Sequence, residues 1–309
     1  MSSDADQRRG FFATSGSRAL PLIESLKRRD VRFSPHRVRT FPNANQWVET
    51  EARVAERCTV IWSPSASVGD SLVELALLAD ALRRSGSRST TCVIPYLDYS
   101  RSDRTEGPGT ALGAKVFADL LCAADVDRFV VFSLHTPAVV GCFQKPVFEI
   151  DAADAVIEHL ASRRFDTVVA PDGGRYREAH RVAERLGAGL ELLLKTRTDH
   201  ALHSRLSPAL GSPERFRGAN VLVFDDEILT GSTLVNALGF IARGEPASVE
   251  VATLYPVCEP SVLSHLFENT VARRITLTNL GRCAGFAAEQ RVGVVDLSGR
   301  LLETLDAVA

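Results

Sequence analysis

The sequence predicts an α/β protein with parallel β-sheets, because short β-rich segments alternate with longer helical patterns along most of the chain. Alternation of this kind is typical of sheets whose two faces are both covered by helices. The hydrophobic content of 45% is sufficient for a substantial core, and the length of 309 residues suggests about two domains.

The expected strands are short runs rich in β-branched and aromatic residues, at residues 58–62, 89–94, 128–132, 167–170, 219–224 and 249–253. Between them lie the longer helical patterns, at residues 69–85, 110–124, 175–186, 232–243 and 259–267. Because helices separate the strands, successive strands are expected to be parallel.

This alternation occurs twice, which predicts two domains, at residues 1–150 and 151–309. The first domain is expected to end near Glu149, where an apolar, strand-like run gives way to Asp-Ala-Ala-Asp. The second restarts with a helix at residues 152–163. A return of the C-terminal tail to the first domain remains open.

The net charge of −2 argues against a nucleic-acid partner, which requires a basic surface. No apolar run reaches the roughly 18–20 residues that span a bilayer, and residues 1–10 lack the apolar core of a secretory signal. We therefore expect a cytoplasmic protein without a membrane partner. The six cysteines form no Cys-x-x-Cys pair, so we expect buried thiols rather than a zinc site or disulfides.

One segment, residues 198–218, differs from the rest of the chain. It is polar, contains Pro208, Gly211 and Pro213, and is expected to join two strands. Long loops in compact domains often close over a binding site, so a mobile lid is predicted here.

The strongest local signal is the segment 221–233, in which an apolar strand runs into Asp225 and Asp226, then into Thr-Gly-Ser-Thr and an apolar helix. Ligands of open α/β sheets bind at the carboxyl ends of the strands. Gly231 permits a tight turn, and the hydroxyl and N–H groups around it can hold a phosphate at the helix N-terminus. The two carboxylates can accept hydrogen bonds from vicinal sugar hydroxyls, directly or through a metal. The simpler interpretation is a helix cap preceded by acids that face solvent.

This loop resembles the sugar-phosphate-binding signature of type I phosphoribosyltransferases. Further segments are similar to motifs of the ribose-phosphate diphosphokinase family, namely its ATP segment, its Asp-Leu-His metal segment, its Pro-Asp-x-Gly-Gly turn and its catalytic flexible loop. These segments are, in the same order, residues 94–104, 133–137, 170–174 and 195–197. The resemblance implies two tandem type I phosphoribosyltransferase-like domains. It also implies Mg²⁺-dependent transfer of diphosphate from ATP to the anomeric hydroxyl of ribose 5-phosphate, and a homo-oligomer between dimer and hexamer.

The resemblance also implies roles for individual residues. Lys195 and Arg197 stabilise the transition state, and His135 and Asp172 contact the metal. Residues that bind ATP are Phe41, Asn43, Asn45, Arg101, Ser102, Asp103 and His135. Residues that bind the sugar phosphate are Asp225, Asp226, Leu229, Thr230, Gly231, Ser232 and Thr233. A neighbouring subunit is expected to contribute the segment 41–45 to the adenine pocket.

Three positions depart from the family pattern. Ser102 replaces the usual Gln, Asn45 replaces Glu, and Leu229 replaces Asp or Ser. Leu229 and Asn45 leave open the same reaction on another sugar phosphate, such as a ketohexose 6-phosphate. Two further hypotheses also stay open: a phosphoribosyltransferase that consumes the diphosphate sugar, and an inactive regulatory homologue that binds synthetase subunits.

Overall fold

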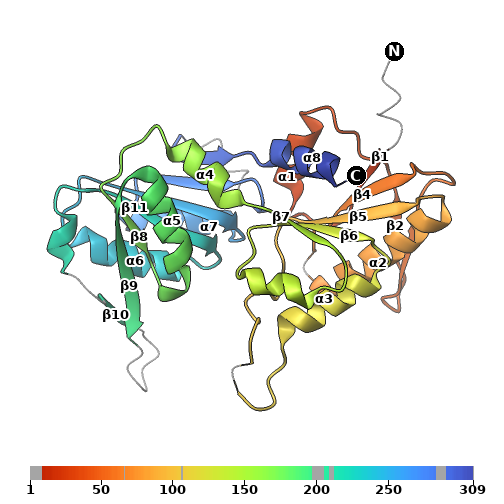
Figure 1. Ribbon diagram of the computed structural model, residues 1–309, viewed down its shortest axis with the longest axis horizontal. Coiled ribbons are helices and arrows are strands. Elements are labelled where there is room, and N and C mark those ends of the chain that lie inside the picture. The colour runs from red at the N-terminus through yellow and green to blue at the C-terminus, as the bar shows by residue number, and fades with distance from the viewer. Residues whose placement is uncertain are drawn as a thin grey trace. The chain divides into compact units, whose positions relative to one another are not determined.

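The computed structural model describes residues 9–65, 67–105, 107–196, 205–208, 212–282 and 290–308, with the backbone alone for residues 175, 194–196 and 205–208. The chain divides into two compact units (Figure 1). The first unit comprises residues 1–150 together with 298–309, and the second comprises residues 151–297. The C-terminal segment therefore belongs to the first unit although it follows the second unit along the chain.

The first unit is built on a five-stranded parallel sheet with the order β1-β4-β5-β6-β7. Its strands are β1 (Arg9–Ala13), β4 (Arg57–Ile61), β5 (Ser89–Ile94), β6 (Arg128–Phe132) and β7 (Val147–Ile150). A separate antiparallel hairpin is formed by β2 (Arg37–Thr40) and β3 (Gln46–Glu49). The helices are α1 (Leu20–Lys27), α2 (Val68–Arg84), α3 (Gly113–Ala123) and α8 (Ser298–Ala307), with a 3₁₀ turn η1 (Pro137–Cys142).

Helices cover both faces of this sheet, with α1 and α8 on one side and α2 and α3 on the other (Figure 1). The core under α2 and α3 is centred on Trp62, Phe117 and Phe129. Trp62 and Phe117 pack with their ring centroids 5.7 Å apart, and the buried Trp62 Nε1 donates to the carbonyl of Ser71 at 3.2 Å. A tryptophan is buried favourably only when its N–H finds an acceptor, so this bond helps to fix α2 on the sheet.

Helix α8 is held on the first unit by arginines from two strands of its sheet. Arg9 pairs with Asp306 at 2.8 Å and donates to the carbonyl of Leu305 at 2.7 Å. Arg128 donates to the carbonyl of Val308. Cations at a helix C-terminus satisfy its free carbonyls and interact favourably with its dipole. These contacts explain why the tail groups with the first unit.

The second unit contains a seven-stranded sheet with the order β10-β9-β8-β11-β12-β13-β14, in which only the β9–β10 pair is antiparallel. Its strands are β8 (Thr167–Ala170), β9 (Gly189–Thr196), β10 (Arg205–Pro208), β11 (Asn220–Ile228), β12 (Ser248–Pro256), β13 (Arg274–Thr278) and β14 (Val292–Val295). Its helices are α4 (Ala152–Leu160), α5 (Tyr176–Leu186), α6 (Ser232–Ala242) and α7 (Pro260–Asn269), with 3₁₀ turns η2 (Gly173–Arg175) and η3 (Pro213–Phe216).

The α/β class with parallel sheets is confirmed in both units. Each predicted strand and helix has a counterpart, and the largest shift in a helix start is that of α3, which begins at Gly113 rather than at residue 110. Part of the segment predicted to be a lid is regular, because β10 pairs with β9 and η3 follows it. The rest of that segment, at residues 198–204 and 209–211, lies outside the described residues.

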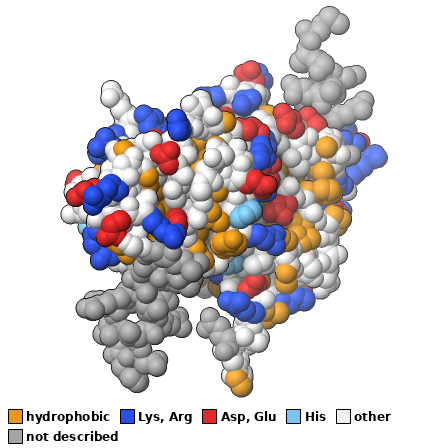
Figure 2. Space-filling view, turned by 60° about the vertical axis from the view of Figure 1, so that its left-hand side comes forward, with side chains coloured by type: hydrophobic (Ala, Val, Ile, Leu, Met, Phe, Trp, Pro, Cys, Tyr) orange, Lys and Arg blue, Asp and Glu red, His pale blue; other side chains and the backbone are white. Residues whose placement is uncertain are grey.

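Surface charge agrees with the near-neutral composition. On the face seen in Figure 2, acidic and basic side chains are interspersed rather than gathered by sign. Within the described part of the chain, no helix is long and apolar enough to cross a membrane. Five of the six cysteines lie in that part, and all five are free thiols.

Candidate active-site residues in the two units

Strand β11 carries three consecutive acids into the interior of the second unit. Asp225, Asp226 and Glu227 are only 6%, 6% and 8% exposed. They are buried because β11 lies in the middle of the sheet, between β8 and β12. The N–H of Asp226 donates to Oδ1 of Asp225 at 2.9 Å, which ties the acid pair together. These acids do not face solvent, so the simpler interpretation of a capped helix behind exposed acids does not describe the loop.

Adjacent buried carboxylates repel one another and are costly to desolvate, so they are typical of sites that receive a cation or hydroxyl donors. Glu227 is a third buried acid that the sequence prediction did not select. In the sequence, Glu227 directly follows the two aspartates. An acid in this position is also expected where a strand ends in solvent, so the sequence alone does not indicate that Glu227 is buried.

The turn after β11 has the geometry of an anion-binding loop. Gly231 precedes α6 with φ of 75°, a conformation that glycine adopts without strain. Thr230 and Ser232 are exposed, and their hydroxyl oxygens lie 3.1 Å apart. Leu229 is 56% exposed, so it does not pack between the helix and the sheet. The loop therefore presents hydroxyl groups, the first N–H groups of α6 and one apolar side chain at its surface.

Asp172 leaves the sheet beside the acids of β11. Strands β8 and β11 are parallel neighbours, and Val169 is paired with Val223. Asp172 and Asp226 each lie three residues beyond that pair, so both are near the same edge of the sheet, Asp172 just after β8 and Asp226 in the last part of β11. Oδ1 of Asp172 accepts from the N–H of Gly174 at 3.0 Å and caps η2. Among the described residues, no three His, Cys, Asp or Glu side chains already form a metal-binding group.

The backbone places Lys195 at this edge as well. Ala170 of β8 is paired with Leu192 of β9, and Lys195 lies three residues beyond Leu192, opposite Leu206 of β10. The basic residue therefore lies at the end of the third of three adjacent strands, β11, β8 and β9. Arg197 lies outside the described residues, and its catalytic role stays a prediction.

In the first unit, two segments predicted to bind ATP meet at the ends of the neighbouring strands β5 and β6. Thr136 Oγ1, next to His135, donates to Oδ2 of Asp103 at 3.1 Å. Arg18 braces the loop after β5 through Asp98, at 2.7 and 3.0 Å. Burial raises the pKa of the Asp98 carboxyl, although the guanidinium opposes this effect.

Ser102 lies in the same loop, where its hydroxyl oxygen accepts from the N–H of Gly113 at 3.1 Å and its carbonyl accepts from Ala114 at 3.0 Å. The side chain therefore caps the start of α3. Arg101, just before it, is exposed. Tyr99 was not selected from the sequence, yet it has φ of 63° and packs on Phe117 with ring centroids 5.1 Å apart. Such strained residues cluster at functional sites.

The remaining residues predicted to bind ATP lie at the tip of the β2–β3 hairpin. Phe41 is 49% exposed. Its N–H donates to the carbonyl of Asn45 at 2.8 Å, and Asn43 Oδ1 accepts from the N–H of Asn45 at 3.2 Å. Ala44 completes the turn with φ of 65°. The hairpin therefore has a defined tip that presents an aromatic ring to the outside of its own unit.

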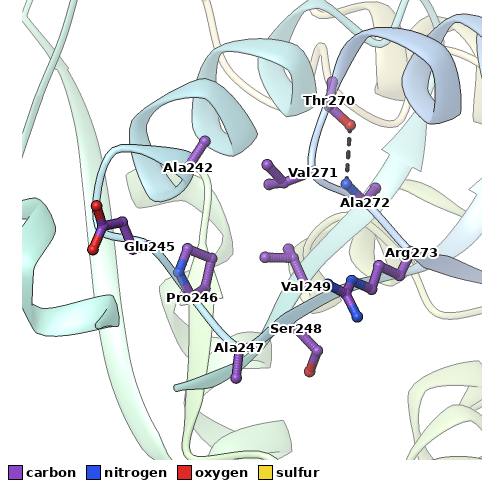
Figure 3. A pocket seen from close by; sticks show the side chains of 10 residues that line it. All are labelled: Ala242, Glu245, Pro246, Ala247, Ser248, Val249, Thr270, Val271, Ala272 and Arg273. Carbon is purple, nitrogen blue, oxygen red and sulfur yellow. Dashed lines mark hydrogen bonds between the residues drawn. The ribbon is translucent and has the colours of Figure 1, made fainter. Parts of the chain in front are cut away.

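A cavity of about 390 Å³ lies elsewhere in the second unit (Figure 3). Glu245, Pro246, Val249, Val271 and Arg273 are among its lining residues. These residues adjoin the starts of β12 and β13, whereas the acids lie at the end of β11. The cavity is thus at the opposite edge of the sheet from the acid loop and includes none of the predicted site residues.

Two family models match the chain. The model described as the N-terminal domain of ribose phosphate pyrophosphokinase matches residues 13–124, and the phosphoribosyl transferase domain model matches residues 143–263. Ribose-phosphate pyrophosphokinases of Granulibacter bethesdensis and Rhodopirellula baltica are 32% and 31% identical to the chain. The match covers 78% of this chain and of the former, and 80% of this chain and of the latter.

The crystal structure of phosphoribosylpyrophosphate synthetase from Mycobacterium smegmatis matches with a TM-score of 0.82 and 27% identity, over 97% of this chain and 98% of that one. Each unit is an α/β unit built on a mainly parallel sheet, and in the second unit the central strand β11 carries an acid pair near its end and is followed by the turn at Gly231. These features define a protein of the phosphoribosyltransferase class. With relatives matched over most of their length, the chain belongs to the ribose-phosphate pyrophosphokinase family.

Proposed function

We propose that this chain transfers the diphosphate group of ATP to the anomeric hydroxyl of ribose 5-phosphate, giving phosphoribosyl diphosphate and AMP. The observation that carries the proposal is the buried pair Asp225 and Asp226, followed by the left-handed Gly231 at the start of α6. Buried acids can accept hydrogen bonds from ribose hydroxyls, and the helix N-terminus can hold the 5-phosphate. Family membership supports the same reaction.

In this reaction the anomeric oxygen forms a bond to the β-phosphorus of ATP. The bond from that phosphorus to the α–β bridging oxygen breaks, AMP leaves, and the hydroxyl proton is released. Phosphoryl transfer of this kind depends mainly on alignment of the reactants and on neutralisation of charge. We assign the charge stabilisation to Lys195 and Arg197, because Lys and Arg suit transferring phosphoryl oxygens.

We propose Mg²⁺ as the cofactor. When bound, it would neutralise phosphate charge and orient the diphosphate. The side chains at the ends of β8 and β11 fit this ion, since Asp172, Asp225 and Asp226 offer the carboxylate oxygens that Mg²⁺ prefers, and the last two are buried. His135 would contact the metal on the ATP phosphates.

We assign ATP to the first unit, with Arg101 and Asp103 at the phosphates or ribose and Phe41 at the base. The exposed Phe41 ring at the hairpin tip supports a contact with the adenine of a neighbouring subunit, and hence a homo-oligomer. The cytoplasm is the proposed compartment, because free thiols such as Cys122 and Cys142 persist in a reducing environment.

The test is ³¹P NMR of the purified protein with Mg²⁺, ATP and a panel of sugar phosphates. AMP together with a new sugar diphosphate signal is the expected result with ribose 5-phosphate. Release of ADP or inorganic phosphate alone would overturn the proposed reaction. Lack of turnover with every sugar phosphate would favour the inactive regulatory homologue.

A second candidate is the same reaction on another sugar phosphate, such as a ketohexose 6-phosphate. The observation that favours it is the 56% exposure of Leu229 in the loop assigned to the phosphate. An exposed leucine offers this loop no hydrogen bond where the family pattern has Asp or Ser. Faster turnover of the hexose phosphate in the same panel would establish this second candidate.

A further inference from the structure

A buried carboxylate outside the site residues joins three segments of the first unit. Glu74 of α2 is 3% exposed and is the only buried charged side chain among the described residues of that unit. Its Oε1 accepts from both the N–H and the hydroxyl of Ser15, each at 2.7 Å. Nε2 of His36 lies 3.8 Å from the same oxygen. Ser15 follows β1, and His36 directly precedes β2.

Burial of a lone carboxylate is costly, and the cost persists unless partners compensate for it. Burial by itself raises the pKa of Glu74, but His36 and the Ser15 donors outweigh this effect and hold the pKa below its usual value. The side chain is therefore an anion at neutral pH. A leucine at this core position would be buried without the free-energy cost of desolvating a charge. We therefore attribute the presence of a carboxylate to the contacts that it makes with Ser15 and His36.

Those contacts lie at the base of the β2–β3 hairpin. The His36 ring packs edge-on against Phe12, with centroids 6.4 Å apart, and its side chain is 11% exposed. Val48 of β3 packs against the core beneath α2. The base of the hairpin is thus clamped to the unit, whereas its tip carries the exposed Phe41.

Because the tip of the hairpin is far from its base, a small rotation at the base displaces the tip by several ångströms. Phe41 is five positions after His36, which corresponds to about 16 Å of extended chain. A tilt of about 10° at the base would move the tip by about 3 Å, and a gap of about 1 Å already forfeits up to about half of a van der Waals contact between an aromatic ring and a nucleotide base. A small change in the orientation of the hairpin base therefore produces a large displacement of Phe41 relative to the nucleotide.

We propose that Glu74 and His36 are positioning residues for the nucleotide, which fix the base of the hairpin so that its tip presents Phe41 to the adenine of ATP. This inference rests on the proposed function. Neither residue touches substrate, and both act through the hairpin. Their loss is expected to lower the affinity for ATP and to leave the affinity for ribose 5-phosphate unchanged, because the acid loop belongs to the other unit.

The test compares His36→Gln and Glu74→Gln with Asp127→Asn as the matched control. Asp127 also accepts a backbone N–H, that of Thr90 at 2.7 Å, and pairs with Arg83 at 3.2 Å, but it directly precedes β6, and both of these partners lie outside the hairpin. Steady-state kinetics give KM for each substrate and kcat, calorimetry gives the affinity for Mg·ATP, and Tm reports folding.

For the two hairpin variants, KM for ATP should rise about tenfold, while kcat and KM for ribose 5-phosphate stay within about twofold. The double variant should match the single ones, because both residues act through one contact. The control should lower Tm without changing KM for ATP.

Equal increases in both KM values, or an unchanged KM for ATP in folded variants, would overturn the inference. So would a control that raises KM for ATP as much as the hairpin variants do. A wild-type protein that binds ATP but transfers no diphosphate would instead refute the proposed function, and the calorimetric comparison would still test the hairpin.

Discussion

Gly231 at the start of α6 lies directly against Val262 of α7: a Cβ on residue 231 would be 2.8 Å from Cγ1 of Val262. Since φ of residue 231 is also 75°, the turn excludes other residues on two separate grounds. Replacement by alanine requires both backbone strain and a shift of the Val262 side chain.

Gly231→Ala should therefore lower Tm and raise KM for the sugar phosphate, with a strain cost of roughly 1–3 kcal/mol. Thermal melts and kinetics measure both. Gly239→Ala is the matched control, because Gly239 lies in the same helix and a Cβ there meets nothing within 4 Å. The control should be neutral or slightly stabilising. Equal melting temperatures for the two variants would contradict the steric argument.

Lys195→Ala should leave folding and substrate affinity nearly unchanged and lower kcat, because its charge is needed most in the transition state. The expected cost is roughly 3–4 kcal/mol, as for loss of one oxyanion donor. Lys27→Ala serves as the control, since Lys27 is exposed and pairs with Glu24 one helical turn away. A kcat within about tenfold of wild type would remove Lys195 from the catalytic group.

The double variant Asp225→Asn, Asp226→Asn should weaken binding of the sugar phosphate and leave ATP binding nearly unchanged. The reason is that the acids lie at the end of β11 in the second unit, whereas Arg101, Asp103 and His135 belong to the first. Calorimetric titration with each ligand measures the two affinities. Comparable losses for ATP and the sugar phosphate would disprove this division between the units.

Leu229→Ser separates the two candidate substrates. Because Leu229 is 56% exposed, the change should leave Tm nearly unaltered. A hydroxyl that contacts the phosphate contributes roughly 0.5–3 kcal/mol, so the variant should favour ribose 5-phosphate over a ketohexose 6-phosphate. The ratio of kcat/KM for the two sugars is the measurement. An unchanged ratio would mean that residue 229 does not determine specificity.

Acid should unfold the second unit partly through Asp151, which caps α4 and pairs with Arg181 at 2.8 Å. Burial alone would raise the pKa of Asp151, but the hydrogen bond and charge of Arg181 hold it below the usual 3.8. A lowered pKa stabilises the folded state above pH 3.8, and this stabilisation disappears as the pH falls through the folded-state pKa.

Asp151→Asn keeps a good helix cap and removes the charge. Its Tm deficit should thus be largest near pH 7 and vanish at low pH, whereas Asp151→Ala should retain a further deficit of about 1 kcal/mol from the lost cap. Melting curves between pH 3 and 7 measure both. A deficit for the Asn variant that does not depend on pH would contradict the role of the charge.

The sequence by itself determined the features that depend on neighbouring residues. Alternating β-rich and helical segments predicted the parallel α/β sheets, and the segment 221–233 predicted a strand that runs into Asp225 and Asp226, a turn at Gly231 and a helix, which β11 and α6 bear out. Strand propensity, helix periodicity and turn chemistry act within a few residues, so local patterns contain this information.

Only the tertiary structure decided which distant groups share a contact. Arg9 and Asp306, 297 residues apart, attach α8 to the first unit. The hydroxyl of Ser102 caps α3 through Gly113, 11 residues away, and Glu74 is buried against Ser15, 59 residues before it. No local pattern encodes these pairs, because burial and long-range hydrogen bonds exist only once the sheet has brought its strands and helices together.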